Sequence, residues 1–472
     1  MPRLPNRLAG TAILLLVTGL GLCLYSLLDS VPGVTWSKYK APDPGTNAVL
    51  NAISCPNTHT CWAVGETSTS AFALHGSNGI WTASYLKATA GTVPTLQAVS
   101  CWSATGCLAV GSMRLDESYA PLLFKYNGAA WTQVVIPTIG AADVLSDVEC
   151  HSQLDCLVTG SSTSGGGMGI TLPATSFLLS NAGGSWMIIH AAPVPTTYPN
   201  ASTENYSNLV CPLLDRCMIV DSYISSASSQ TILVDGANNW KQYATSGLST
   251  ITAAACESET VCWFVGSSKT NGTLAADEFS SGFAQSTSLP DPASPPATSR
   301  SNSSPFISLD TYAPSLITSI SCVNGKSTCL AVGNCPSQRG TRTLALVLSG
   351  STWTLTQPPA PERSSPHCSP QLDTPIGPAA AHLSKHPSSG IRITYVLPAV
   401  TSSSFTAVSC TMENTCWAVG TETGDPSHPL LIAEATLHAS VILQPSMVTG
   451  IFLLLIASGF ILIYLRKRKE ES

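Results

Sequence analysis

Charged residues are scarce in this sequence, and their scarcity narrows the class of protein. Asp, Glu, Lys and Arg together make up only 10% of the 472 residues. No long heptad or 3.6-residue hydrophobic pattern stands out between residues 30 and 440. Serine, threonine, alanine, glycine and valine dominate instead, and this composition suits short strands and tight turns better than long solvated helices. The sequence therefore predicts an all-β protein.

Basic residues are especially few away from the two ends of the chain. Between two apolar segments near the ends, acidic residues outnumber basic ones by about ten. Nucleic acids and anionic lipid surfaces need a basic footprint on the proteins that bind them. We therefore expect no nucleic-acid partner.

Motifs for metal, redox or cofactor chemistry are also lacking. None of the 17 cysteines belongs to a C-x-x-C pair, which argues against a redox enzyme. No set of residues that would converge on one catalytic, metal or cofactor site stands out. We predict no cofactor, no metal site and no catalytic residues.

What the sequence does contain is one pattern repeated seven times. Each copy is an apolar stretch ending in a cysteine, a short polar gap, and a second cysteine followed by a small apolar run, as in FTAVSCTMENTCWAVG. The first cysteines lie 46, 49, 61, 45, 66 and 88 residues apart, and the shorter intervals match a propeller blade of about 40 to 50 residues. The copies begin at Leu50, Leu96, Leu145, Tyr206, Ile251, Ile317 and Phe405.

Two further strands follow most cysteine pairs. PLLFKYNGAAWTQVVIP, after the second pair, shows the pattern of an apolar strand, a tight turn and a strand that opens on Trp. The seventh copy has the apolar strand from Pro429 but no Trp strand after it. The segment VTWSKYKAP near the N-terminus supplies one, so we expect Trp36 to lie beside the strand around Leu431. Four strands per copy and this closure predict a seven-bladed β-propeller of four-stranded antiparallel blades.

The aromatic residues that open these last strands are expected to pack between blades, because aromatic side chains bury the largest area per residue. A ring that stacks on carbohydrate is the alternative interpretation. In the fifth copy Phe stands where Trp is expected. The set comprises Trp36, Trp81, Trp131, Trp186, Trp240, Phe283 and Trp353.

The paired cysteines are six residues apart in six copies and seven apart in one. This spacing places the two sulfur atoms opposite each other across a hairpin, within reach of a bridge. Disulfides are the best explanation in an extracytoplasmic protein. Zinc is the competing one, but each pair offers only two of four ligands. The predicted bridges are Cys55–Cys61, Cys101–Cys107, Cys150–Cys156, Cys211–Cys217, Cys256–Cys262, Cys322–Cys329 and Cys410–Cys416.

Three cysteines stand outside the repeats. Cys335 and Cys368 are the two that would lie outside the membrane, and an eighth bridge between them is the simplest assignment. A reactive thiol or an intermolecular bridge is the alternative. Cys23 falls in the first apolar segment and is expected to be a thiol within the membrane.

Two segments, Leu8–Leu28 and Met447–Leu465, are long and apolar enough to cross a bilayer, which takes about 20 residues. Basic residues flank the outer end of each, so both termini are expected in the cytoplasm and the rest outside. The first segment is interpreted as an uncleaved signal anchor, because no small-x-small site follows it before Asp29; a cleaved signal peptide is the alternative.

These observations divide the chain into a signal anchor at residues 1–29, an extracytoplasmic propeller at 30–440, a second transmembrane helix at 446–466 and a basic tail at 466–472. Two stretches rich in Pro and Ser, at about 267–316 and 357–404, are predicted to be flexible insertions from the rim of the propeller.

The turns before the Trp strands, such as SNAGGSW from Ser180 and SNGIW from Ser77, resemble a degraded Asp-box of sialidase-like propellers. The resemblance implies the fold. It does not imply the activity, because sialidases need an arginine triad, an acid/base Asp and a Tyr nucleophile, and Arg216 is the only Arg inside a cysteine loop. The S-C-x5-C-x-A-V-G repeat is similar to that of bacterial secreted and membrane-anchored propellers at the cell surface.

The leading hypothesis is a non-enzymatic, membrane-tethered propeller that binds a surface protein or glycan. The alternative is a glycoside-active or lyase-type enzyme that uses carboxylates on the central face. It predicts that residues such as Asp147, Glu149, Asp155 and Asp221 gather in one cavity. A third hypothesis is a structural spacer for a neighbouring membrane complex.

Overall fold

The computed structural model describes most of the chain between residues 34 and 437, and these residues form one compact unit, Val34–Leu437. Among the residues described, no helix has the length and apolar character needed to cross a membrane. Both predicted spans and the basic tail lie outside the described residues. The described ranges are 34–87, 93–115, 118–137, 139–140, 142–163, 174–189, 203–213, 216–224, 228–234, 240–280, 283–292, 315–337, 340–358, 382–384, 392–394, 402–423 and 430–437.

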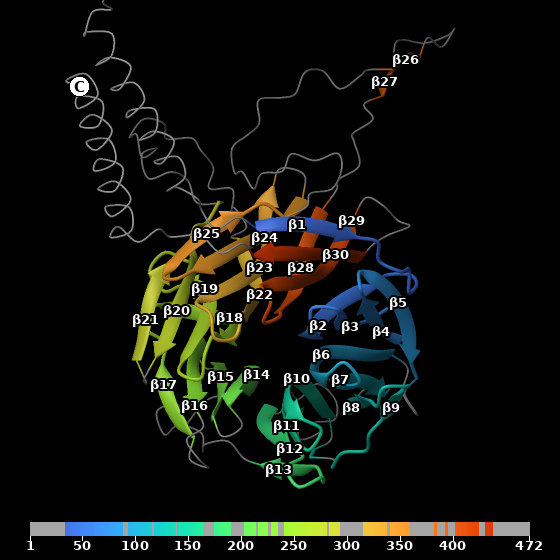
Figure 1. Ribbon diagram of the computed structural model, residues 1–472, viewed down its shortest axis with the longest axis vertical. Helices are drawn as coiled ribbons and strands as arrows, with labels where there is room; N and C mark the ends of the chain where they lie inside the picture. The colour runs from blue at the N-terminus through green and yellow to red at the C-terminus, as the bar shows by residue number, and fades with distance from the viewer. Residues whose placement is uncertain are drawn as a thin grey trace, which may run out of the picture. The chain divides into compact units, whose positions relative to one another are not determined.

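The fold of this unit is an all-β propeller of four-stranded antiparallel sheets (Figure 1). Seven four-stranded sheets are present among the described residues, together with one two-stranded hairpin. The first strand of each sheet contacts the first strand of the next, and the last contacts the first, so the sheets form a closed ring. These first strands are β2 (Val49–Asn57), β6 (Val93–Ser103), β10 (Ala142–Ser152), β14 (Thr203–Leu213), β18 (Leu248–Cys256), β22 (Leu316–Cys322) and β28 (Ser402–Cys410).

The other strands follow outward in chain order, as the repeat predicts. The second strands, which carry the second cysteines, are β3 (Thr60–Glu66), β7 (Gly106–Leu115), β11 (Asp155–Thr163), β15 (Arg216–Ile224), β19 (Val261–Ser268), β23 (Thr328–Ser337) and β29 (Thr415–Thr423). The third strands are β4 (Ala71–Ser77), β8 (Ser118–Tyr126), β12 (Ala174–Ser180), β16 (Ser228–Val234), β20 (Leu274–Ser280), β24 (Gly340–Ser349) and β30 (Leu430–Leu437). The outermost strands are β5 (Ile80–Leu86), β9 (Trp131–Gln133), β13 (Met187–Ile189), β17 (Lys241–Ala244), β21 (Phe283–Ser288), β25 (Thr352–Thr356) and β1 (Val34–Tyr39).

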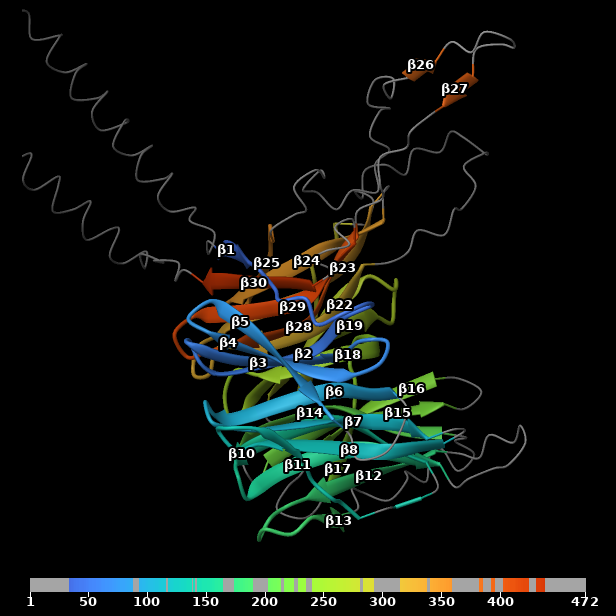
Figure 2. The same cartoon turned by 90° about the vertical axis from the view of Figure 1, so that its right-hand side faces the viewer.

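The N-terminal strand β1 completes the last sheet, whose order is β1-β30-β29-β28 (Figure 2). It pairs antiparallel with β30, with Trp36 opposite Ala435. The predicted position of Trp36 beside the strand that contains Leu431 is therefore confirmed. The Trp36 ring also stacks on Phe405 of β28 at 5.6 Å. Strands from the two ends of the propeller thus share one hydrophobic core.

Apolar clusters fill the space between neighbouring sheets, and the predicted aromatic residues take part in them. In three of these clusters the Trp of an outermost strand meets edge-to-face a Trp that directly follows the second cysteine of the preceding sheet. These pairs are Trp81–Trp417 at 5.5 Å, Trp131–Trp62 at 5.3 Å and Trp353–Trp263 at 5.7 Å. Trp186 and Trp240 are partly buried against two further clusters. Phe283 opens β21, but its side chain lies outside the described part.

Disulfide bonds join the paired cysteines of all seven repeats, as the spacing predicts. The Cα atoms of each pair are 3.9 to 4.1 Å apart, which suits residues directly opposite each other on an antiparallel hairpin. Cys335 is buried and disulfide-bonded. Cys368, its predicted partner, lies outside the described residues, as does Cys23.

The predicted limits of both insertions are wrong. The segment 267–316 contains β20 and β21, which form the outer half of the fifth sheet. The segment 357–404 overlaps the start of β28 and includes the hairpin of β26 (His382–Ser384) and β27 (Arg392–Thr394). Composition placed the limits badly because Ser and Thr are frequent both in strands of this protein and in the segments that surround them.

A β-bulge shapes the first strand of most sheets just after its first large apolar residue. In the last sheet the register shifts between Phe405 and Ala407, and Thr406 is the extra residue. Gly420 on the neighbouring strand is required there, because a Cβ atom at Gly420 would lie 1.9 Å from the carbonyl oxygen of Ser404. The glycine of the repeat therefore makes room for the bulge, and the bulge turns the extra side chain toward the next sheet.

Candidate functional site: the central cavity

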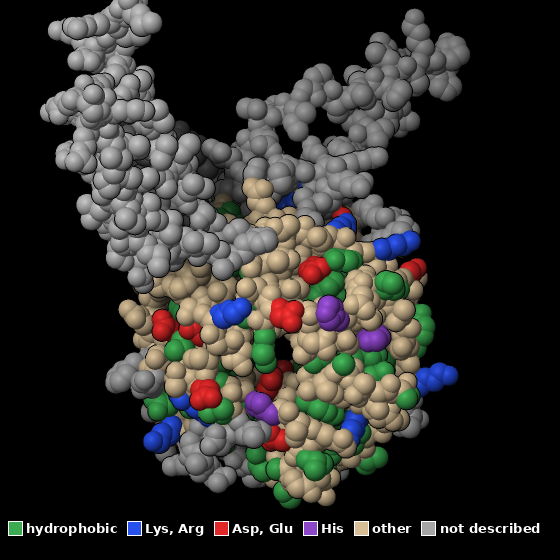
Figure 3. All heavy atoms as spheres, in the orientation of Figure 1, with side chains coloured by type: hydrophobic (Ala, Val, Ile, Leu, Met, Phe, Trp, Pro, Cys, Tyr) green, Lys and Arg blue, Asp and Glu red, His purple; other side chains and the backbone are tan. Residues whose placement is uncertain are grey.

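A cavity of about 770 Å³ lies at the centre of the ring, and all seven first strands contribute to its wall. We call it the central cavity. Figure 3 shows a hollow in the middle of one face of the propeller, with acidic side chains in it. The volume falls within the range of about 300 to 1,000 Å³ that is usual for ligand sites. Most of the lining side chains are small or uncharged.

Serine before the first cysteine links neighbouring sheets around the cavity, and one of these serines, Ser321, is itself a lining residue. In four sheets its hydroxyl accepts a hydrogen bond from the backbone N–H of the first cysteine in the next sheet. The bonds are Ser54 with Cys101 (3.0 Å), Ser100 with Cys150 (3.0 Å), Ser321 with Cys410 (2.9 Å) and Ser409 with Cys55 (3.0 Å). The conserved spacing of the repeat thus becomes a set of links between neighbouring sheets.

The bulged residue makes a second kind of link. Its side chain donates a hydrogen bond to the backbone carbonyl of the next sheet. Examples are Asn51 to Leu96 (2.7 Å), Ser146 to Tyr206 (3.0 Å), Thr318 to Phe405 (2.8 Å) and Thr406 to Leu50 (2.6 Å). Polar side chains on the cavity wall are therefore largely occupied in holding the ring together.

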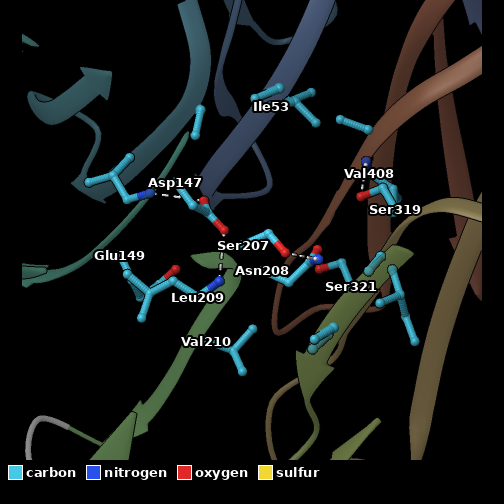
Figure 4. Close-up of a pocket in the computed structure, with 18 of the residues that line it drawn as sticks. Ile53, Asp147, Glu149, Ser207, Asn208, Leu209, Val210, Ser319, Ser321 and Val408 are labelled. Atoms are coloured by element: carbon cyan, nitrogen blue, oxygen red, sulfur yellow. Dashed lines mark hydrogen bonds between the residues drawn. The ribbon is translucent and has the colours of Figure 1, made fainter. Parts of the chain in front are cut away.

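The third sheet departs from this pattern with an aspartate. Asp147 on β10 occupies the position of Ser319 in the sixth sheet. Ser319 accepts a hydrogen bond from the N–H of Val408 at 3.1 Å, and Asp147 accepts the equivalent bond from Leu209 at 2.8 Å (Figure 4). A second bond, from the N–H of Val148, also reaches Asp147 at 2.8 Å. Burial raises the pKa of Asp147 to about 6, although these two N–H groups favour its charged form.

Glu149, two residues further along β10, occupies the position of the linking serines. Its side chain lines the central cavity beside Asp147 and is partly exposed to it (Figure 4). Burial among the surrounding strands, and then the charge of Asp147, raise the pKa of Glu149 to about 8. Among the described residues none donates a hydrogen bond to this carboxylate. Glu149 therefore does not make the link that serine makes elsewhere.

The fourth sheet, which adjoins the third, departs from the repeat as well. Val210 on β14 stands at the serine position, and Asn208 adopts a left-handed backbone conformation with φ of 50°. Nε2 of His151 donates a hydrogen bond across the gap to the carbonyl oxygen of Cys211 at 2.9 Å. Asp221 on β15 replaces the glycine of the repeat and is fully buried. The third and fourth sheets together form the least regular part of the wall.

The four carboxylates predicted for the enzyme alternative do not all gather in one place. Asp147 and Glu149 line the central cavity, whereas Asp155 and Asp221 are not among its lining residues. Asp155 lies at the β10–β11 turn, where a carboxylate oxygen is 3.8 Å from Nδ1 of His151. Within the described part of the chain, no group of three or more potential metal ligands comes together.

Two features of the site were not anticipated from the sequence. One is the link made by the serine before the first cysteine, and the other is the pairing of Trp62, Trp263 and Trp417, which follow second cysteines, with a Trp of the next sheet. An alignment of the seven copies position by position would have shown both the repeated serine and its replacement by Glu149. The difference at position 149 is the signal that marks this wall of the cavity.

No protein family model matches the chain, and no curated protein matches it in sequence. Several solved propellers resemble it in structure. The structure "YCF48 bound to D1 peptide" is 13% identical with a TM-score of 0.46, covering 86% of this chain and 97% of that one. The WD40 β-propeller domain of Doa1 is 10% identical with a TM-score of 0.43, covering 85% and 97%. The structure of U3-55K is 7% identical with a TM-score of 0.46, covering 85% and 98%.

Proposed function

We propose that this protein is a membrane-tethered, extracytoplasmic, seven-bladed propeller that serves as a non-enzymatic binding or scaffold module for a surface protein or glycan. The observation that carries the proposal is the central cavity. A closed ring of sheets surrounds it, each sheet with a disulfide across its first hairpin, and its wall departs from the repeat most at the third and fourth sheets. A rigid ring with one distinct wall can present a fixed set of contacts to a partner at little conformational cost.

Two observations support the proposed location. Seven disulfides are typical of an oxidising compartment outside the cytoplasm. The first and last residues of the propeller, Val34 and Leu437, lie opposite each other in the β1–β30 pair. The chain therefore enters and leaves the propeller at adjacent points, as expected if the apolar segments at both ends insert into one membrane.

Crosslinking tests the binding function. The full-length chain, carrying an affinity tag, is crosslinked in its native membrane and purified, and the captured proteins and glycans are identified. We expect one partner that depends on residues of the central cavity. Recovery of nothing beyond background would count against the proposal. A partner held equally by cavity variants and by the unmodified chain would instead favour the structural-spacer hypothesis.

The pair of carboxylates favours a second candidate function, a glycoside-active or lyase-type enzyme. With pKa values of about 6 and 8, Asp147 and Glu149 can hold one ionised and one protonated carboxyl group near neutral pH, as acid/base pairs do. However, both residues lie on the same strand, β10, and Asp147 already accepts a hydrogen bond from the backbone N–H of Leu209. A screen of oligosaccharides with the full-length chain tests this function: turnover that is lost in Glu149→Gln would establish it.

A further inference from the structure

We propose that Glu149, assisted by Asp147, forms a receptor for an organic cation in the wall of the central cavity. The ligand is an ammonium or guanidinium group, presented by a basic side chain of a protein segment or by a free amine. This inference rests on the proposed binding function and specifies the chemistry of the partner.

The first reason is that Glu149 has no structural task. The four serines at its position in other sheets each accept a backbone N–H from the next sheet. Asp147 accepts two backbone N–H groups. None of the described residues donates a hydrogen bond to Glu149, although its carboxylate faces the cavity. A carboxylate that lines a cavity and has no protein donor can accept hydrogen bonds only from solvent or from a ligand.

The second reason is the charge of the lining. Among the described lining residues, Asp147 and Glu149 are the only acidic ones, and none is Lys or Arg. His151, also on β10, is the one potentially basic residue among those the structure describes in the lining, and its Nε2 atom already donates to the carbonyl of Cys211. A cation that enters the cavity therefore meets two carboxylates and no fixed positive charge. A charge-assisted hydrogen bond in such a site is stronger than a neutral one.

The third reason is the low polarity of the opposite wall. Ile53 and Val408 come from β2 and β28, away from the carboxylates, and Ser319 and Ser321 already accept backbone N–H groups (Figure 4). These side chains are weaker acceptors for a cation than the two carboxylates. A cavity of about 770 Å³ admits a basic side chain together with part of the chain that carries it.

The ionisable groups that face Glu149 are Asp147 and His151 of its own strand. The described lining residues of the neighbouring β6 and β14 carry no ionisable side chain, since Cys211 is disulfide-bonded. Glu149 must release its proton to bind a cation fully, so we expect binding to strengthen about tenfold as the pH rises from about 7 to 8.5, given that one pKa unit corresponds to a factor of ten.

Isothermal titration of the full-length chain in detergent tests the inference. The probes are the peptide Gly-Gly-Arg-Gly-Gly, its citrulline analogue and the free amine spermidine. We expect the arginine peptide to bind at least tenfold more tightly than the citrulline peptide. Glu149→Gln should remove this preference. Glu149→Ser restores the residue found in four other sheets and is a second variant that should fold while losing the preference.

The outcomes separate the possibilities. Binding of the arginine peptide but not spermidine identifies a protein segment as the source of the cation, and the reverse identifies a free amine. Equal binding of the arginine and citrulline peptides, or a preference that survives in both variants, would overturn the inference. If a crosslinked partner is nevertheless captured equally by the unmodified chain and by Glu149→Gln, the binding function stands and only the cation receptor is wrong.

Discussion

Tyr39 donates a hydrogen bond from its hydroxyl group to the carboxylate of Glu434, although the two residues are 395 positions apart in the chain. The bond joins β1 to β30. It raises the pKa of Tyr39 to about 12, with burial and the charge of Glu434 as further causes. A second contact, between Lys38 and Glu422 at 2.6 Å, ties β1 to β29. The closure of the ring therefore includes specific polar contacts besides the pairing of the strands.

Replacing Tyr39 by Phe should weaken this closure. A hydrogen bond to a charged group contributes about 1.5 to 3 kcal/mol, so we expect Tyr39→Phe to lower the free energy of unfolding by that amount. Chemical unfolding followed by tryptophan fluorescence measures it. Tyr85→Phe is the matched control, since Tyr85 is largely exposed and donates to the neutral carbonyl of Pro44 at 3.1 Å. Equal losses in the two variants would contradict a special role for Tyr39.

Gly420, which follows the apolar residues of β29, should not tolerate replacement by any residue with a side chain. A Cβ atom at Gly420 would meet the carbonyl oxygen of Ser404 at 1.9 Å, and a backbone atom cannot move away cheaply. We expect Gly420→Ala to cost about 3 kcal/mol or more. Gly272→Ala is the control. The φ of +69° at this position would strain an alanine, but no atom lies within 4 Å of the added Cβ. It should cost about 1 kcal/mol. A smaller loss at Gly420 than at Gly272 would show that the clash is relieved.

The elements within each repeat could be predicted from the sequence, because the repeat displays them seven times. Hairpin strands, facing cysteines and the turn before each Trp follow from local spacing. The partnership of Trp36 with the last sheet also followed, because one copy lacked a strand and the N-terminus supplied it. A repeated sequence therefore allows the strands and turns within one repeat to be predicted well.

Contacts between copies were harder to predict. The serine links and the edge-to-face Trp pairs join different sheets, and the repeat does not say which residue of one copy meets which residue of the next. Trp62, for example, meets Trp131 because the sheets are stacked around an axis. The role of Glu149 depends on that stacking as well. Only the structure shows that its position faces the cavity and that no residue in the described part of the chain donates to its carboxylate.

The oxidation state of the cysteines is directly testable. With seven bridges in the repeats and the predicted Cys335–Cys368 bridge, only Cys23 should be a free thiol. Alkylation of the denatured, non-reduced chain should therefore add one label by intact mass, and reduction first should add one for each of the 17 cysteines. Three labels before reduction would remove the Cys335–Cys368 assignment. Labels on the repeat cysteines would contradict both the bridges and the extracytoplasmic location.

The stability of the protein should fall between pH 4.5 and 8 because of Glu149. Its pKa is raised from 4.5 to about 8 in the folded state, so the folded form binds the proton more tightly than the unfolded form. The resulting stabilisation is complete below pH 4.5 and is lost as the pH rises through 8. Asp147 adds a smaller loss between about pH 4 and 6, since its pKa is raised from 3.8 to about 6.

Glu149→Gln removes the group that titrates and should flatten the upper part of this profile, so that the variant loses less stability than the unmodified chain between pH 6 and 8.5. We expect the difference to reach a few kcal/mol, since one pKa unit corresponds to about 1.4 kcal/mol. Thermal unfolding of the full-length chain across this pH range measures it. Glu413→Gln, at an exposed site, should leave the profile unchanged. Parallel profiles for Glu149→Gln and the unmodified chain would mean that water or a bound cation already satisfies Glu149 in the folded protein.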